Sequence, residues 1–128
     1  MKAVLDTSVL LGPDPEIPGD AEVAISAISL AELHFGVLAA CTPAVRATRL
    51  RRLGVIESTF DALPVDDSVA REYGRLAAAT VEAGRQPAGR VADLLIAATA
   101  VVHQASLWTR NASGLSGLEG LVDIRTVS

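Results

Sequence analysis

Residues 3–8 read Ala-Val-Leu-Asp-Thr-Ser, a short apolar run that ends abruptly in three polar residues. An apolar run of this length, bounded by turn-forming residues, predicts a strand that is buried on both faces. Strands buried on both faces belong to parallel sheets covered by helices on each side. Asp6 therefore stands where the first strand ends, at the edge where α/β sheets place their functional sites.

Outward from this stretch, short apolar runs alternate with longer helical segments. The further strands are expected at residues 23–25, 63–65, 107–109 and 122–127. The helices are expected at residues 26–40, 43–60, 67–83 and 91–105. Capping residues or proline stand near most of these helix starts. The alternation predicts an α/β fold of three layers, α/β/α, with a central parallel sheet.

The size and composition of the chain narrow the class of protein. Its 128 residues suit one domain spanning residues 1–128, and 50% of them are hydrophobic. The apolar segment 91–108 is interrupted by Asp93 and His103, so it is no membrane span. No secretory leader opens the chain, and Cys41 has no partner for a disulfide, so it is expected to be a buried small side chain. These features predict a cytoplasmic protein.

Three acids stand alone in apolar surroundings. Asp6 is the only charged residue between Lys2 and Asp14. Glu32 is likewise alone between Glu22 and Arg46, and Asp93 is alone between Arg90 and Arg110. Burying an unpaired carboxylate costs several kcal/mol unless it is neutralised or coordinated. Convergence on one hard divalent cation explains all three acids, and oxygen ligands favour Mg²⁺ or Mn²⁺ over Zn²⁺.

Each acid also has a purely structural interpretation. Asp93 falls in the first turn of its helix, where a negative charge interacts favourably with the helix dipole. Glu32 follows Ser29 by three residues and completes a capping box. Asp6 is a turn former ahead of Thr7. The structural interpretations need a separate reason for the isolation of each acid, whereas a shared metal site explains all three at once.

Four segments together resemble the PIN-domain family and, more narrowly, the VapC-type toxins of bacterial toxin–antitoxin pairs. They are LDTSVL around Asp6, ISLAELHFG around Glu32, DLLIAATA from Asp93, and Thr109-Arg110-Asn111 after a short strand. The likeness extends over nearly the whole chain, with the motifs in the expected order and at about the expected spacing. One such motif is a weak signal, but four in order are specific.

The resemblance implies a PIN-like fold and a metal-dependent endoribonuclease, the toxin of a type II toxin–antitoxin pair, which cleaves RNA through water activated by Mg²⁺ or Mn²⁺. Asp6, Glu32 and Asp93 carry over as catalytic, metal-binding acids, with Ser8 and Asn111 as supporting polar residues. The resemblance also implies a homodimer and a hetero-oligomer with a VapB-type antitoxin that blocks the acidic pocket.

The sequence departs from the family pattern at one position. The family usually has a fourth acid three residues after the asparagine, where this chain has Gly114. Glycine offers no ligand, so a second metal ion lacks a partner unless Asn111, Ser113, Ser116 or Glu119 substitutes for it. A catalytically weakened PIN domain that acts mainly as an antitoxin- or RNA-binding module is therefore the alternative.

Contacts to RNA depend on local cations, because the net charge is −4. Arg85, Arg90 and Arg110 flank the acidic motifs and are the candidate phosphate contacts, although a solvated surface role fits them equally well. Four aromatic residues are too few for a base-stacking platform, which favours a structured RNA recognised by shape. A receiver domain, the second alternative, needs a lysine near the last strands, yet Lys2 is the only lysine.

Overall fold

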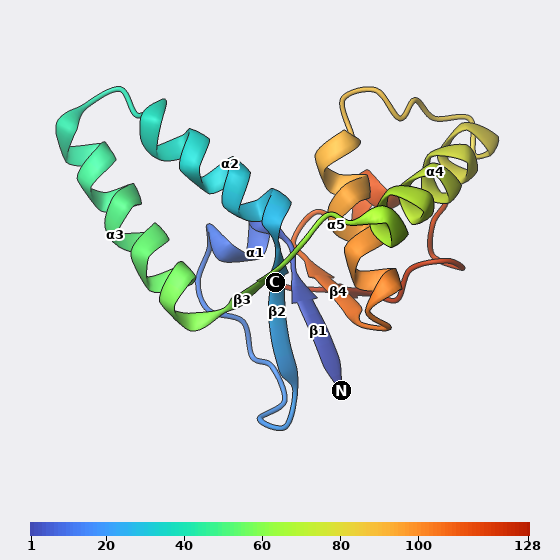
Figure 1. The fold of residues 1–128 in the computed structure, drawn as a ribbon, viewed down its shortest axis with the longest axis horizontal. Coiled ribbons are helices and arrows are strands. Elements are labelled where there is room, and N and C mark those ends of the chain that lie inside the picture. Colours follow the sequence, from blue (N-terminus) through green and yellow to red (C-terminus); the bar gives the residue numbers. More distant parts are fainter.

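The central element is a sheet of five parallel strands in the order β3-β2-β1-β4-β5. The computed structural model describes residues 1–128. The strands are β1 (Lys2–Leu5), β2 (Glu22–Ser26), β3 (Asp61–Leu63), β4 (Ser106–Thr109) and β5 (Ile124–Thr126). All five run in one direction, so their carboxyl ends meet at one edge, the upper edge in Figure 1.

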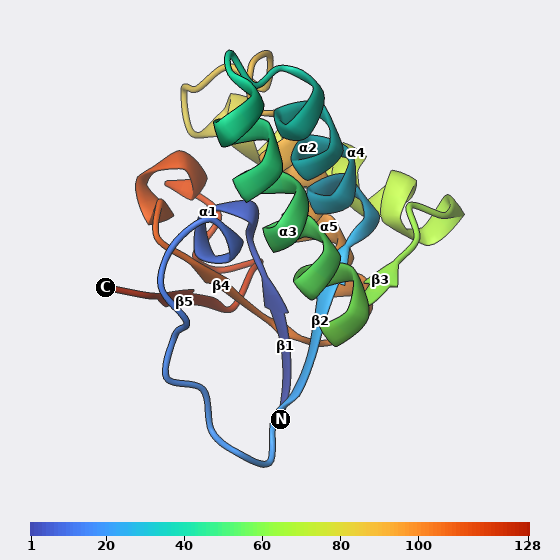
Figure 2. The same ribbon diagram turned by 90° about the vertical axis from the view of Figure 1, so that its left-hand side faces the viewer.

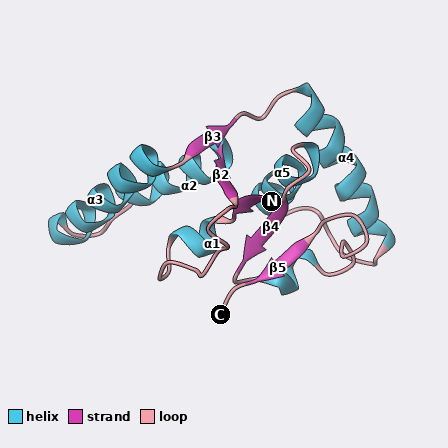
Figure 3. Ribbon diagram, turned by 90° about the horizontal axis from the view of Figure 1, so that it is seen from below, coloured by secondary structure: helices cyan, strands magenta, loops and turns pink.

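Helices cover both faces of this sheet. The group on one face is α1 (Thr7–Leu10), α2 (Ala27–Leu38) and α3 (Pro43–Thr59), which lie in front of the strands in Figure 2. The group on the other face is α4 (Asp67–Glu82) and α5 (Val91–Val102). Figure 3 shows the two groups on opposite sides of the strands. The predicted three-layer α/β/α architecture is confirmed.

Two hydrophobic cores explain why the buried residues of the first strand are all apolar. Val4 packs with residues of α4, α5 and β4, whereas Leu5 packs with residues of α1, α2 and α3. Successive side chains of a strand point to opposite faces, so both positions of a central strand must be apolar. Val4 and Leu5 are 1% and 2% exposed. Helix α5 is buried along most of its length, as its nearly uniform apolar sequence predicts.

Most helix starts follow their capping residues. Thr42 caps α3, with Pro43 in its first turn, and Asp66 caps α4. Helix α2 differs from the capping-box interpretation, because Ser26 caps it by accepting a hydrogen bond from the Ile28 N–H. Ser29 is fully buried inside the helix instead, so Glu32 is free of a capping role.

Several local features differ from the sequence-based expectations. Residues 7–10 form the short helix α1, which no periodicity indicated, because four residues are too few to show a helical repeat. Strand β3 covers residues 61–63 rather than 63–65. Cys41 is exposed in the turn between α2 and α3, so its expected burial is wrong. None of the helices has the length and apolarity needed to span a membrane.

Candidate active site

Asp6 lies beside the end of β4, the strand that pairs with β1. Asp6 follows β1 directly, and its backbone N–H donates to the Trp108 carbonyl at 2.9 Å. Its carboxylate, in a residue only 9% exposed, accepts two hydroxyl hydrogen bonds at Oδ2, from Thr109 at 2.6 Å and from Ser8 at 3.0 Å. Two donors on one oxygen hold the carboxylate in a fixed orientation.

Glu32 is held by Thr7 of α1, which also contacts Ser29 of α2. It lies in the second turn of α2, and its Oε1 accepts a hydrogen bond of 2.7 Å from the Thr7 hydroxyl. The same hydroxyl lies 2.9 Å from Ser29 Oγ. Thr7 therefore connects Glu32 to the loop that carries Asp6. No contact between the acids and Thr7, Ser29 or Thr109 was expected from the sequence. The available signal is that Thr7 and Thr109 are hydroxyl residues at strand ends, while Ser29 lies one helical turn before Glu32.

Asp93 shares the electrostatic environment of the other two acids. It lies in the first turn of α5. Burial raises the pKa of Asp93, and the negative charges of Asp6 and Glu32 raise it further, while Arg90 acts in the opposite direction. Asp6 follows β1, Glu32 contacts the adjacent Thr7, and the charges of both acids act on Asp93, so the structure brings the three predicted acids near one another.

The carboxylates suit a hydrated divalent cation rather than one held by all three acids at once. No group of three or more His, Cys, Asp or Glu side chains is placed so that it could hold a metal ion, so the structure does not show the predicted convergence of Asp6, Glu32 and Asp93 on one cation. Asp6 and Glu32 each accept hydrogen bonds on one oxygen only, and no protein group donates to Asp93. Mg²⁺ keeps several of its waters and uses one or two carboxylates directly, so oxygens left free in this way suit it.

The segment after β4 borders Asp93 from the other side. A Cβ added at Gly114 would lie 3.8 Å from Asp93 Oδ2 and 3.5 Å from Asn111 Nδ2. Position 114 therefore faces the acids, and glycine leaves this side open. Ser8, the other predicted supporting residue, both donates to Asp6 and accepts from the Arg110 N–H at 3.0 Å.

The residues considered as substitutes for a fourth acid are engaged in their own turn. Glu119 accepts from the Gly117 N–H at 2.9 Å, and Ser116 donates to the Ser113 carbonyl at 2.9 Å. Ser113 in turn donates to Asn111 Oδ1 at 3.0 Å. These contacts stabilise the segment around the 3₁₀ helix η1 (Ala112–Leu115) and add no carboxylate to the acidic edge.

The three candidate phosphate contacts lie in two different places. Arg85 and Arg90 line a shallow pocket of about 410 Å³ together with Asp93 and Asn111. Arg110 lines a different pocket, where it donates to the carbonyls of Pro13, at 2.5 Å, and Ser128. The structure thus brings two of the three arginines to the acids, while the third ties the chain end to the loop after α1.

A second hollow adjoins Glu32 and lies between α1, α2 and α3. It has a volume of about 370 Å³, and its lining includes Thr7, Glu32, Phe35 and Arg52. Phe35 is 72% exposed and the nearby Leu38 is 77% exposed, values unusual for large apolar side chains. The arginines of α3 include Arg52, which donates to the Leu10 carbonyl at 2.6 Å and so fixes α3 against α1.

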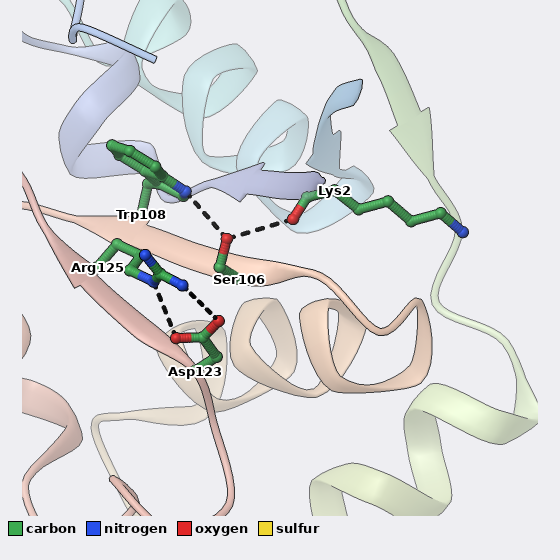
Figure 4. A network of polar contacts seen from close by, with 5 residues as sticks. All are labelled: Lys2, Ser106, Trp108, Asp123 and Arg125. Carbon is green, nitrogen blue, oxygen red and sulfur yellow. Dashed lines mark hydrogen bonds and ion pairs between the residues drawn. The ribbon is translucent and has the colours of Figure 1, made fainter. Parts of the chain in front are cut away.

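The amino ends of the strands carry a separate polar network, shown in Figure 4. Ser106 donates to the Lys2 carbonyl at 3.2 Å and accepts from Trp108 Nε1 at 3.1 Å. The Lys2 side chain extends away from these contacts at the start of β1, the end of the strand opposite Asp6. The one lysine of the chain is thus remote from the acids, which argues against a receiver-type site.

Comparison with known proteins gives one consistent result. The PIN domain family model matches residues 3–113. Ribonuclease VapC5 of Mycobacterium tuberculosis is 36% identical over 97% of this chain and 93% of its own length. Ribonuclease VapC8 of the same species is 35% identical over 77% of this chain and 90% of its own length.

Solved structures agree with this result. The crystal structure of VapBC-5 from Mycobacterium tuberculosis, a member of the VapBC family of toxin–antitoxin systems, has a chain that superimposes with a TM-score of 0.81. That chain is 37% identical, with 98% of this chain and 97% of that chain covered. FitAcB from Neisseria gonorrhoeae gives a TM-score of 0.77 at 28% identity, with 95% of each chain covered.

Proposed function

The chain belongs to the PIN-domain family, and from this premise we propose that it is a VapC-type ribonuclease, the toxin of a toxin–antitoxin pair. The relatives named above are ribonucleases or members of toxin–antitoxin complexes. The observation in this chain that supports the proposal is that Asp6 and Glu32 lie near Asp93, close enough for their charges to raise the pKa of Asp93.

We infer that the enzyme depends on Mg²⁺ or Mn²⁺. A divalent cation, when bound, supplies Lewis acidity at the phosphate and lowers the pKa of the attacking water. Asp6 would hold it through the oxygen left free by Ser8 and Thr109, and Glu32 through the oxygen left free by Thr7. These two carboxylates are held in place by hydroxyls before any ligand arrives, which lowers the cost of binding.

Asp93 has a different role in the proposed reaction. Its carboxylate accepts no hydrogen bond from the protein, and burial together with neighbouring acids raises its pKa. A carboxylate of raised basicity is a better proton acceptor than an ordinary one. Asp93 would therefore orient the water and accept its proton as the water oxygen bonds to phosphorus. The P–O bond to the leaving 3′ oxygen breaks, and this oxygen takes a proton from solvent, which leaves a 5′-phosphate on one fragment of the structured RNA and a 3′-hydroxyl on the other.

The catalytically weakened form of the same domain is the second candidate function. Gly114 favours it, since a glycine faces Asp93 where an acid would complete the group. In that case the chain binds an antitoxin or RNA and turns over slowly. A rate of cleavage that rises in Gly114→Asp by more than about tenfold would support this second candidate.

The partner surface is proposed from exposed apolar side chains. Phe35 and Leu38 stand on α2 beside the hollow that reaches Glu32, so a peptide bound there would cover the acidic edge as well. We propose that a VapB-type antitoxin occupies this surface in the cytoplasm and that the toxin forms a homodimer within the complex. An apolar face next to an active site suits an inhibitor that must block it.

The test is cleavage by the purified chain. Wild-type protein and the Asp6→Asn variant are incubated with total cellular RNA, with Mn²⁺ or with EDTA, and the new 5′ ends are sequenced. The proposal expects defined 5′-phosphate ends only for the wild-type protein with metal. Equal cleavage by Asp6→Asn, or cleavage in EDTA, would show that the reaction does not use this site.

A further inference from the structure

Two arginines are held against adjacent backbone carbonyls at the edge of the acidic site. Arg85 Nη1 donates to the Ser113 carbonyl at 2.9 Å, and Arg90 Nη1 donates to the Gly114 carbonyl at 2.6 Å. Arg85 follows α4, Arg90 immediately precedes α5, and the two carbonyls belong to η1. Contacts between three separate segments therefore fix both guanidinium groups on one side of Asp93.

Neither guanidinium forms an ion pair with an acid, although the charge of Arg90 acts on Asp93. The ion pairs of the structure are His34–Glu57, Arg75–Glu72 and Arg125–Asp123. None of them involves Arg85 or Arg90. A guanidinium has five N–H donors, and each of these two uses one of them on a carbonyl. Several donors and a full positive charge on each side chain remain for a ligand.

Gly114 keeps the space between Arg90 and the acids open. A Cβ at this position would lie 3.7 Å from Arg90 Nη1 and 3.8 Å from Asp93 Oδ2. A carboxylate built on that Cβ would pair with the guanidinium and remove its charge from the pocket. With glycine, the pocket of about 410 Å³ has two unpaired cations on its wall and Asp93 at its edge.

We propose that Arg85 and Arg90 form a phosphate-binding subsite beside Asp93, which holds a backbone phosphate of the RNA next to the one that is cleaved. Planar guanidinium groups bind phosphate oxygens through paired N–H donors, and two of them suit a single phosphodiester. The subsite explains how a chain of net charge −4 holds a polyanion at an acidic edge. This inference rests on the proposed function for its ligand, RNA.

The experiment measures RNA binding separately from cleavage. A fluorescein-labelled RNA hairpin is titrated with each protein in EDTA, at several salt concentrations, and binding is followed by fluorescence anisotropy. The variants are Arg85→Gln, Arg90→Gln, Arg90→Lys and Gly114→Asp. The matched control is Arg71→Gln, since Arg71 is exposed on α4 and makes no hydrogen bond or ion pair. Circular dichroism checks that each variant is folded.

The expected result is a change in both affinity and salt dependence. Loss of one phosphate contact decreases the magnitude of the slope of log K against log salt by about 0.7–0.9. Arg85→Gln and Arg90→Gln should each show this decrease with several-fold weaker binding, whereas Arg90→Lys and the control should keep the wild-type slope. Gly114→Asp should weaken binding without the loss of any arginine.

Two results would overturn the inference. One is a wild-type slope in both Arg85→Gln and Arg90→Gln, and the other is the absence of RNA binding by the wild-type protein. Failure of the proposed function looks different. If these arginines set the salt dependence but no RNA is cut with Mn²⁺, the phosphate subsite stands and the nuclease assignment falls.

Discussion

The Thr7 hydroxyl donates a hydrogen bond of 2.7 Å to Glu32 Oε1 across 25 residues of sequence. Thr7 comes directly after Asp6, so one dipeptide supplies both an acid of the site and the group that orients another acid. Ser29 contacts the same hydroxyl at 2.9 Å. The position of Glu32 is thus linked to the end of β1.

Replacement of Thr7 by valine tests this link. Thr7→Val keeps the shape of the side chain but leaves Glu32 and Ser29 without their partner, so the free energy of unfolding should fall by about 1–3 kcal/mol. Cleavage should slow by about 10–100-fold, the usual effect of removing a group that orients a metal ligand. Thr48→Val is the control, because Thr48 is exposed and donates only within α3. Wild-type cleavage by a destabilised Thr7→Val would limit Thr7 to a structural role.

Metal binding should stabilise the folded protein. A ligand that binds only the native state at 100 times its dissociation constant adds about 2.7 kcal/mol. We therefore expect Mn²⁺ to raise the Tm of the wild-type protein and to have little effect on Asp6→Asn or Glu32→Gln. Differential scanning fluorimetry with and without EDTA measures this. An equal rise in Tm in all three proteins would place the metal elsewhere.

The raised pKa of Asp93 predicts a pH-dependent cost to stability. A carboxyl group with a higher pKa in the folded state favours folding when it is protonated, and this contribution is lost as the pH rises through the folded pKa. Without metal, Asp93→Asn should therefore have a higher Tm than wild type at pH 7, by a few degrees at most because Asp93 is partly exposed. The difference should vanish below the ordinary pKa of 3.8. Thermal unfolding in EDTA across this range checks it, and a lower Tm for Asp93→Asn at pH 7 would contradict it.

The exposed apolar side chains of α2 should matter for binding and not for folding. Phe35→Ser and Leu38→Ser remove side chains that are 72% and 77% exposed, so the free energy of unfolding should change by less than about 0.5 kcal/mol. Affinity for a co-purified antitoxin should fall by at least about tenfold. Val81→Ser is the control, since Val81 is an exposed residue of α4. Isothermal titration calorimetry gives the affinities, and unchanged values would move the antitoxin to another surface.

The main elements were predictable because their signals are local. Runs of apolar residues marked the strands, and Thr42 and Asp66 marked the starts of two helices by their caps. The isolation of Asp6, Glu32 and Asp93 in sequence pointed to one shared site, because burial without a partner is costly for a carboxylate. The structure buries only Asp6 among them, whereas Asp93 is half-buried and Glu32 is exposed, so the expected burial of Glu32 is wrong.

The remaining features depend on contacts between distant segments. The Arg110 guanidinium points away from the acids because it donates hydrogen bonds to the carbonyls of Pro13 and Ser128. No local sequence pattern predicts contacts between residues so far apart in the chain. Ser29 fits a capping box in sequence, but its burial against Thr7 decides its role. The same applies to Thr109, whose bond to Asp6 joins residues 103 positions apart.

That bond has a consequence for protein synthesis. Asp6 emerges from the ribosome among the first residues, but β4 and Thr109 follow only when most of the chain has been translated. A nascent or truncated polypeptide that ends before β4 has a β1 without this neighbour and an Asp6 without this restraint. The chain would thus acquire its full site only near the completion of its own translation.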